Sequence, residues 1–139
     1  MEGVELIPVK FDKVKQSKTY TCIVLGTEKV KFAIYTDPTS GKAMQTYLTE
    51  SEKPRPSTHD LMMMMFRGLD IKIRQVVIND LQETVYFARI FLEQKIGEII
   101  NIVEIDARPS DCITLALMNK IPVYCTKDVL EKIVPVLDD

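Results

Sequence analysis

Hydrophobic and polar residues alternate along several stretches of the chain with the two-residue period of half-buried β-strands. This pattern predicts strands at residues 4–9, 19–26, 29–35, 71–79, 84–93, 98–105 and 123–125. Short turns join two pairs of these segments, one at residues 26–28 and one around Gly97. Long segments joined by short turns indicate hairpins, so we expect mostly antiparallel pairing.

Pro, Ser or Thr precedes each of the remaining ordered segments, as is usual at helix starts. The pattern predicts four helices, at residues 42–49, 58–67, 109–118 and 127–134. Gly41 weakens the first turn of the first helix, and Asn119 is the expected left-handed terminator of the third. Long hairpins with about four helices indicate the α+β class, with residues 1–139 forming a single compact domain around a mostly antiparallel or mixed sheet.

A hairpin followed by a Pro-containing helix start occurs twice. Residues 19–35 lead into Asp37-Pro38-Thr39, and residues 84–105 lead into Arg108-Pro109-Ser110. Two interpretations remain open: an internal duplication of a β-β-α unit, and a chance similarity of two common hairpins.

Two clusters of similar residues have an ordinary and a functional interpretation. Lys10, Lys13, Lys15 and Lys18 favour a solvated loop over a nucleic-acid contact, because Asp12 dilutes their charge.

The run of methionines at 62–65 covers every side of its helix. We expect a core stripe of Leu61, Met65 and Leu69. Met63 and Met64 then face another element or a second subunit, so a homo-oligomer, with a dimer as the first hypothesis, is a reasonable expectation.

Overall charge and cysteine content narrow the class of protein. With 18 Lys and Arg against 20 Asp and Glu in 139 residues, the net charge of −2 excludes binding of nucleic acid by overall positive charge, although a local basic patch remains compatible. The three cysteines, Cys22, Cys112 and Cys125, are too few and too scattered for a disulfide framework or a zinc site. We expect free thiols in a reducing compartment.

The chain has no apolar run near the ~18–20 residues of a membrane span, and charges interrupt its N-terminal segment. We therefore expect a cytoplasmic protein without a membrane partner.

The tripeptide Arg-Pro-Ser begins two predicted helices, at Arg55 and at Arg108, and Asp60 or Asp111 follows each copy closely. A helix N-terminus beside a guanidinium suits phosphate, so two such sites could hold two phosphates of a nucleic-acid backbone. The same residue types also cap helices, with Ser57 and Asp60 resembling a capping box, and spacing alone favours capping.

His59 is the only histidine of the chain and is a candidate general acid or base. A surface or supporting position is the more common one for a single histidine in a first helical turn. Asp60, Asp106 and Asp111 are candidate oxygen ligands for Mg²⁺ or Mn²⁺, although their spacing matches no fixed metal motif. Asp80 follows a predicted strand and favours a turn.

Five short segments, taken together, resemble the bifunctional nuclease domain family. They are Arg55-Pro56-Ser57-Thr58-His59-Asp60-Leu61, Val76-Val77-Ile78-Asn79-Asp80-Leu81, Thr84-Val85-Tyr86-Phe87-Ala88-Arg89, Glu104-Ile105-Asp106-Ala107-Arg108-Pro109-Ser110-Asp111 and Ile121-Pro122-Val123-Tyr124. The resemblance covers about residues 29–134. It implies a compact α+β domain found in bacteria and plants, and the family's name implies hydrolysis of both DNA and RNA.

On this resemblance we expect a nuclease. Arg55 and Arg108 would hold backbone phosphates, and His59, Asp60 and Asp111 would carry catalysis. The cofactor stays undetermined, and Mg²⁺ or Mn²⁺ is compatible with the candidate carboxylates.

One departure favours other functions. The family usually begins its first helix with Glu-Ala-Glu-Ala, and Ser40-Gly41-Lys42-Ala43 stands there in this chain. The loss of two carboxylates leaves two alternatives: a module that binds nucleic acid or another phosphate ligand without cleaving it, and a homo-oligomeric interaction scaffold.

Overall fold

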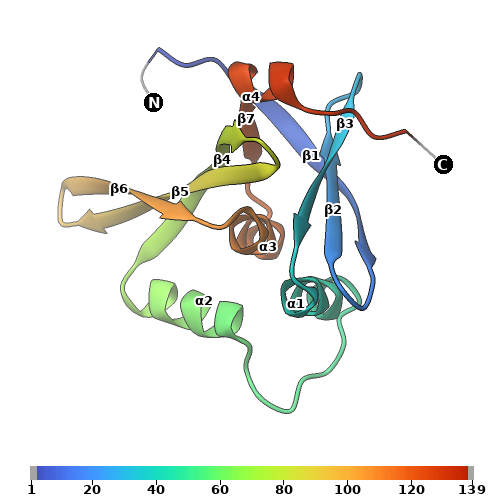
Figure 1. Cartoon of the computed structure of the whole chain (residues 1–139). Helices are drawn as coiled ribbons and strands as arrows, with labels where there is room; N and C mark the ends of the chain where they lie inside the picture. Colours follow the sequence, from blue (N-terminus) through green and yellow to red (C-terminus); the bar gives the residue numbers. More distant parts are fainter. Residues whose placement is uncertain (1–2, 138–139) are drawn as a thin grey trace.

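A single seven-stranded sheet runs through the computed structural model, which describes residues 3–137. In chain order the elements are β1 (Leu6–Gln16), β2 (Thr21–Gly26), β3 (Lys31–Thr36), α1 (Pro38–Leu48), α2 (Thr58–Gly68), β4 (Ile71–Gln82), β5 (Val85–Ile96), β6 (Ile99–Ala107), α3 (Pro109–Asn119), β7 (Val123–Thr126) and α4 (Lys127–Lys132). Figure 1 shows the sheet as two wings, with α3 between them, α1 below β1–β3 and α2 below β4–β6. The predicted α+β class is confirmed.

The two halves of the chain repeat one order of elements. The strands lie in the order β3-β2-β1-β7-β4-β5-β6. Each wing is therefore an antiparallel three-stranded meander whose last strand leads into a helix, α1 in one half and α3 in the other. β7 joins the wings, antiparallel to β1 and parallel to β4. The repeating unit of the fold is thus β-β-β-α, one strand longer than the predicted β-β-α unit.

The core lies between the wings and is filled by α3. Residues Cys112 to Ala116 of this helix are all buried, together with Ile23, Leu25 and Phe32 from the wing formed by β1, β2 and β3. All three cysteines are buried and free, as expected. Burial raises the pKa of the Cys112 and Cys125 thiols to about 12, so these thiols stay protonated near neutral pH. None of the helices in residues 3–137 has the length and apolar character needed to cross a membrane.

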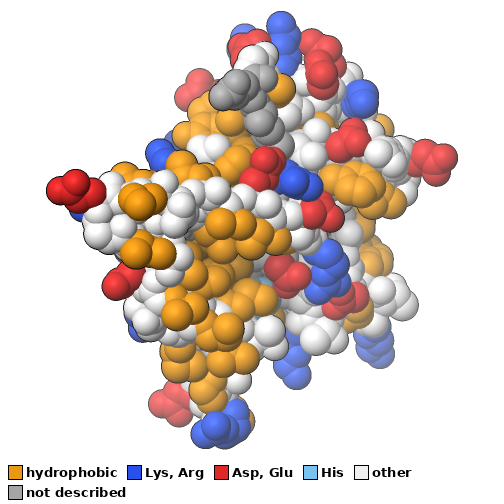
Figure 2. All heavy atoms as spheres, turned by 90° about the vertical axis from the view of Figure 1, so that its left-hand side faces the viewer, with side chains coloured by type: hydrophobic (Ala, Val, Ile, Leu, Met, Phe, Trp, Pro, Cys, Tyr) orange, Lys and Arg blue, Asp and Glu red, His pale blue; other side chains and the backbone are white. Residues whose placement is uncertain are grey.

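The expected core stripe of α2 is wrong. Leu61, Met65 and Leu69 are 53%, 53% and 56% exposed, and it is Met62, Met63 and Phe66 that pack on the core. The helix is apolar on all sides, so periodicity alone could not select the inner side. Figure 2 shows the resulting band of hydrophobic side chains on this side of the molecule.

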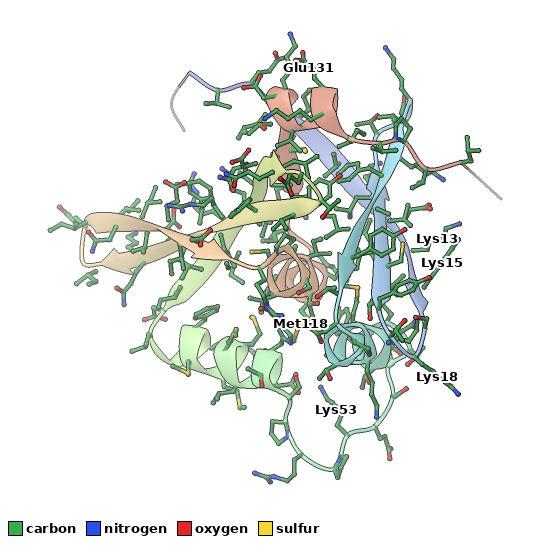
Figure 3. The ribbon with its side chains drawn as sticks, viewed as in Figure 1. Lys13, Lys15, Lys18, Lys53, Met118 and Glu131 are labelled. Atoms are coloured by element: carbon green, nitrogen blue, oxygen red, sulfur yellow. The ribbon has the colours of Figure 1, made fainter. Side chains whose placement is uncertain are left out.

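The lysine-rich segment is a strand and not the predicted loop. β1 continues through Lys10, Lys13 and Lys15 to Gln16, while Lys18 lies in the turn that follows. A β-bulge between Phe11 and Lys13 breaks the two-residue alternation, which conceals the strand in the sequence. Figure 3 shows Lys13, Lys15 and Lys18 on the outer side of their wing.

Other boundaries differ by a few residues. Asp80 lies within β4, at a bulge beside Ile78, rather than in a turn. The left-handed residue that ends α3 is Lys120, with a φ of 54°, and not Asn119. α4 ends at Lys132, two residues before the predicted end.

α1 begins at Pro38, four residues before its predicted start, and Gly41 is the reason. This glycine is buried, and a Cβ at this position would overlap Thr21 Oγ1 and Gln16 Oε1. The missing side chain allows the helix to approach β2 closely. There Thr21 Oγ1 contacts both Gln16 Oε1 and the carbonyl of Asp37, at 3.1 and 2.9 Å.

We predict that Gly41→Ala destabilises the protein by about 1–3 kcal/mol, because the added methyl group forces α1 away from β2. Urea denaturation measures the change. Gly68→Ala is the matched control, since a Cβ there meets open space, and it should change the free energy of unfolding by less than about 0.5 kcal/mol. Equal effects of the two substitutions would contradict this account of Gly41.

Candidate functional site

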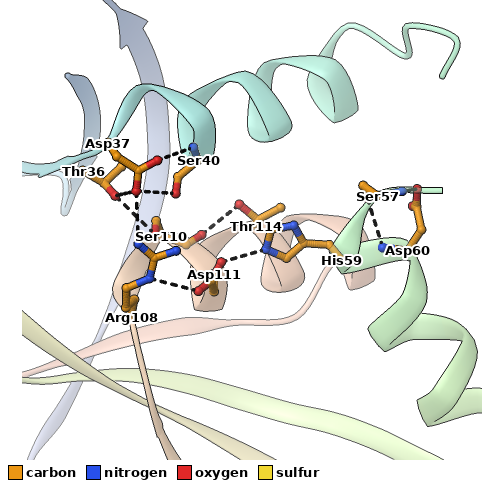
Figure 4. A network of polar contacts seen from close by, with 10 residues as sticks. All are labelled: Thr36, Asp37, Ser40, Ser57, His59, Asp60, Arg108, Ser110, Asp111 and Thr114. Carbon is orange, nitrogen blue, oxygen red and sulfur yellow. Dashed lines mark hydrogen bonds and ion pairs between the residues drawn. The ribbon is translucent and has the colours of Figure 1, made fainter. Parts of the chain in front are cut away.

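A chain of ion pairs connects the starts of three helices at one end of α3. Arg108 Nη1 donates to Asp37 Oδ2 at 3.1 Å, and Arg108 Nε donates to Asp111 Oδ2 at 3.3 Å. The other oxygen of Asp111 lies 3.0 Å from His59 Nε2. Figure 4 shows this network crossing from α1 through α3 to α2.

Asp37 is the N-cap of α1. Its Oδ1 accepts from the backbone N–H of Ser40 at 2.8 Å, and its Oδ2 accepts from the Ser40 hydroxyl at 3.0 Å. These two bonds to Ser40, with the Arg108 guanidinium, lower the pKa of Asp37 to about 2. Asp37 therefore stays ionised at neutral pH and both caps the helix and anchors Arg108.

Asp111 lies between two basic side chains. The hydrogen bond from His59 lowers its pKa most, and Arg108 adds to the effect, while partial burial opposes it. The His59 side chain is only 10% exposed. A carboxylate in this position orients the imidazole ring.

The capping box predicted at the start of α2 is confirmed. The backbone N–H of Ser57 donates to Asp60 Oδ2 at 2.8 Å, and the backbone N–H of Asp60 donates to Ser57 Oγ at 3.1 Å. Asp60 also forms an ion pair with Lys53. The hydrogen bond from Lys53, followed by that from Ser57, lowers the pKa of Asp60 to about 2. These contacts fix the first turn of α2, from which His59 projects.

A pocket of about 240 Å³ opens between α1, α2, α3 and the loop before α2. Its charged and titratable lining consists of Lys42, Tyr47, Lys53, His59 and Asp60. The structure describes no hydrogen-bond partner for His59 Nδ1 among residues 3–137, and this atom is not sealed from solvent. Figure 3 shows Lys53 in the loop between α1 and α2, below the end of α3 that carries Met118. The pocket lining therefore combines two lysines, of which Lys53 is paired with Asp60, with an imidazole whose other nitrogen is held by Asp111. Lysine and histidine side chains together are suited to a phosphate ester.

The two Arg-Pro-Ser segments do not form equivalent sites. Ser57 is the N-cap of α2, whereas Arg108 itself is the N-cap of α3. The Arg55 side chain is exposed and has no ion pair within residues 3–137. The structural counterpart of Arg108-Pro109-Ser110 is instead Asp37-Pro38-Thr39, and these two helix starts meet through the Arg108–Asp37 pair.

The candidate metal ligands are held by separate partners. Asp60 pairs with Lys53, Asp111 pairs with His59 and Arg108, and Asp106 on β6 lies 3.8 Å from Arg89. In the part of the chain from 3 to 137, no three His, Cys, Asp or Glu side chains are grouped so that they could hold a metal ion. The expected Mg²⁺ or Mn²⁺ site of Asp60, Asp106 and Asp111 is therefore not formed by these residues.

Sequence reasoning missed three site residues: Asp37, Lys42 and Lys53. The repeated hairpin-and-helix pattern already aligned Asp37 with Arg108, and this was the available signal for Asp37. Lys42 stood within the departure from the usual acidic helix start. Lys53 lies in a polar linker and carried no signal.

Comparison with protein families gives one match. The model of the bifunctional nuclease domain matches residues 23–136, which is most of the chain and includes all of the pocket.

Comparison with individual proteins gives partial matches. Two strains of Mycobacterium tuberculosis carry an uncharacterized protein that is 35% identical over 79 residues, 57% of this chain and 44% of the relative. Bifunctional nuclease 1 of Arabidopsis thaliana is 31% identical over 80 residues, 58% of this chain and 24% of the relative. Bifunctional nuclease 1 of Oryza sativa subsp. indica is 28% identical over 76 residues, 55% of this chain and 23% of the relative. Each match spans less than half of the relative's own length.

We predict that acid destabilises the protein through Asp37 and Asp60. Both have a pKa of about 2 when folded, against an ordinary value of about 3.9 in an unfolded chain. Their stabilising contribution is therefore complete above about pH 5 and is lost as the pH falls towards 2. Asp37→Asn keeps a capping side chain but removes this titration. It should flatten the pH dependence of the free energy of unfolding between pH 5 and 2.5.

Urea denaturation across this pH range tests the prediction. At pH 7 solvent screening should limit the cost of Asp37→Asn to about 1 kcal/mol or less, because the Asp37 side chain is 43% exposed. A pH dependence identical to that of the unsubstituted protein would show that Asp37 does not contribute.

Proposed function

This chain belongs to the bifunctional nuclease domain family, and we propose that it hydrolyses phosphodiester bonds of DNA or RNA in the pocket between α1, α2 and α3. The observation that carries the proposal is the pairing of His59 with Asp111 at 3.0 Å beside a pocket lined by Lys42 and Lys53. The relatives named as bifunctional nucleases support the reaction type. The buried free thiols support a reducing compartment such as the cytoplasm.

His59 is the general base of the proposed reaction. Its Nδ1 accepts a proton from a water molecule as the water oxygen forms a bond to phosphorus, and the bond from phosphorus to the leaving ester oxygen breaks. Asp111 stabilises the resulting imidazolium through the hydrogen bond to Nε2. The leaving oxygen takes the proton from the imidazolium, directly or through a water molecule, which returns His59 to its neutral form.

The two lysines of the pocket hold the phosphate. Lys42 from α1 and Lys53 from the loop both line the pocket, and they neutralise the charge that develops on the phosphoryl oxygens. Asp60 is a positioning residue, because its carboxylate holds both Lys53 and the first turn of α2. Arg108 positions Asp111 in the same way, and Arg55 reaches a more distant backbone phosphate.

No step of this reaction is assigned to a metal ion. Asp60, Asp106 and Asp111 each have a basic partner within the chain, and no three carboxylate, thiol or imidazole groups of residues 3–137 converge. The side chains do not fit an Mg²⁺ or Mn²⁺ site built from protein ligands alone. The proposal therefore depends on His59 as the base and on the two lysines as hydrogen-bond donors.

A second function is favoured by Lys42. In place of the acidic helix start usual for the family, this chain puts a cation into the pocket. A pocket with two lysines binds a phosphate group whether or not it cleaves the ester. The alternative is therefore a domain that binds nucleic acid without hydrolysing it.

We predict that His59→Ala and Asp111→Asn each lower kcat/KM for cleavage by about 10²–10⁴-fold, because each removes the activated base. Purified protein is assayed on single-stranded RNA and on duplex DNA, with Mg²⁺, Mn²⁺ or a chelator. Asp128→Asn, an exposed carboxylate on α4, is the matched control and should retain full activity.

Circular dichroism must show that the variants are folded. Activity that is equal in His59→Ala and the unsubstituted protein would overturn the assignment of this site. Absence of cleavage in every sample would support the binding function instead.

We predict that Lys42→Ala weakens binding of a cleavage-resistant oligonucleotide and lowers the salt dependence of log K by about 0.7–0.9, the slope expected for one lost phosphate contact. Fluorescence anisotropy at several salt concentrations measures both effects. Lys29→Ala is the control, since Lys29 is exposed in the β2–β3 turn and away from the pocket lining. An unchanged slope in Lys42→Ala would exclude Lys42 from the phosphate site.

A further inference from the structure

β6 exposes apolar side chains on both of its faces. Five of the nine residues of the strand are large and apolar, and each is between 41% and 66% exposed: Ile99, Ile100, Ile102, Val103 and Ile105. A strand with one face on the core and one in water alternates apolar with polar residues. β6 does not, so its composition is that of a strand covered on both faces.

One face of β6 lies on the side of the sheet that is buried in the core on the neighbouring strand β5. Ile105 and Val103 lie beside Ile90 and Leu92 of β5, which are 5% and 8% exposed. The same side of the sheet is therefore buried on β5 and open on β6. No helix in the described part of the chain covers this outermost strand.

The outer edge of β6 is also unpaired. β6 is the last strand in the sheet order, and no other segment of residues 3–137 pairs with its free side. Long apolar edge strands associate with other strands, and natural proteins usually block them with Pro, Lys or a bulge. β6 contains neither Pro nor Lys and pairs with β5 in an unbroken register.

The outer side of α2 extends this surface. Leu61, Met64, Met65 and Leu69 are each about half exposed. Figure 2 shows hydrophobic side chains in a continuous band from the β5–β6 hairpin down to α2. We call the five exposed apolar residues of β6, the neighbouring Ile96, and Leu61, Met64, Met65 and the C-cap residue Leu69 of α2 the apolar face.

We propose that the apolar face is the contact surface of a homodimer, in which β6 pairs antiparallel with β6 of a second copy around a two-fold axis. An antiparallel edge is self-complementary, since a two-fold axis brings the same strand against itself in the required direction. Pairing centred on Ile102 places Ile102 against its own copy and Ile99 opposite Ile105. In the same register Ile100 lies opposite Glu104, and Asn101 lies opposite Val103.

The size of the apolar face fits a second copy of the chain. At roughly 100 Å² of exposed area for each half-exposed large side chain, its ten residues expose on the order of 1,000 Å², divided between the two faces of β6 and the outer side of α2. One partner of a standard protein interface contributes about 800 Å², whereas apolar patches on monomers reach only about 300–600 Å².

The charges near the face favour a protein surface over nucleic acid. β6 has no Lys or Arg, and its two acidic residues already pair with Arg89 of the same chain, Glu104 at 3.3 Å and Asp106 at 3.8 Å. A nucleic-acid surface requires unpaired cations at such a position. With its acidic charges satisfied internally, the strand presents mainly apolar groups and free backbone.

Sedimentation equilibrium at 1–100 µM tests the dimer. The unsubstituted protein should sediment as a species of about twice 15.9 kDa. The double substitution Ile102→Lys/Val103→Lys places a charge on each face of β6 and should raise the dimer Kd by at least about 100-fold. Val134→Lys is the matched control, because Val134 is 80% exposed but lies near the C-terminal end, away from the apolar face. It should remain dimeric.

A monomer at 100 µM in the unsubstituted protein would overturn the proposal, as would a dimer that persists in a folded double variant. Hydrogen exchange on the unsubstituted protein gives a second measurement that does not depend on the folding of a variant. Amides of residues 99–107 should become better protected as the protein concentration rises through the Kd, and those of β3, at the opposite edge, should not. Protection of 99–107 that is independent of concentration would contradict pairing through β6.

Discussion

The Arg108 guanidinium, held between Asp37 and Asp111, is the interaction on which the arrangement of the pocket depends. The first carboxylate caps α1 and the second faces His59 at the start of α2, so one side chain connects all three helices. Each carboxylate has a lowered pKa, and the network therefore stays charged over the physiological range. Arg108 is itself the N-cap of α3, the buried central helix, so the network is anchored to the core.

This constraint matters most for α2. The loop that precedes α2 is exposed. The residues of α2 that pack on the core, Met62, Met63 and Phe66, have unbranched or planar side chains, which could pack with the helix rotated by several angles about its axis. The bond from His59 to Asp111 and the capping box of Ser57 and Asp60 select one of these rotations. The polar contacts thus determine which side of an apolar helix faces the core.

The strand pattern could be predicted from alternation in β5, where buried residues alternate with half-buried ones from Ala88 to Leu92. Prediction failed where a bulge shifted the alternation, as in β1 between Phe11 and Lys13, and where the helix was apolar all round, as in α2. It also placed the start of α1 too late, because the low helix propensity of Gly41 is outweighed by the close packing that a glycine permits against Thr21. Local preference was overridden by tertiary contacts in each case.

The candidate site could be predicted only in part, for a related reason. His59, Asp60, Arg108 and Asp111 lie in short segments typical of a family. The structure joins His59, Arg108 and Asp111 at the start of α3, and Asp60 lies beside His59 in the first turn of α2. Asp37 and Lys42 come from the other half of the chain, and Asp37 joins the site only because α1 and α3 occupy equivalent places after two equivalent meanders. The symmetry of the fold, rather than any local motif, is what brings the two helix starts together.

α2 contributes residues both to the proposed phosphodiester-binding pocket and to the proposed dimer contact. Its first turn presents His59 to the pocket, and its outer side presents Leu61, Met64 and Met65 to the apolar face. Leu61 is only two residues from His59, so a second copy docked on this side would restrain the turn that carries the proposed base. Restraint of that turn lowers the number of orientations open to the imidazole, and ordered placement of a base is what proton transfer to it requires. The apolar exterior of α2 and the buried pair of His59 with Asp111 are therefore physically connected through a single helical turn.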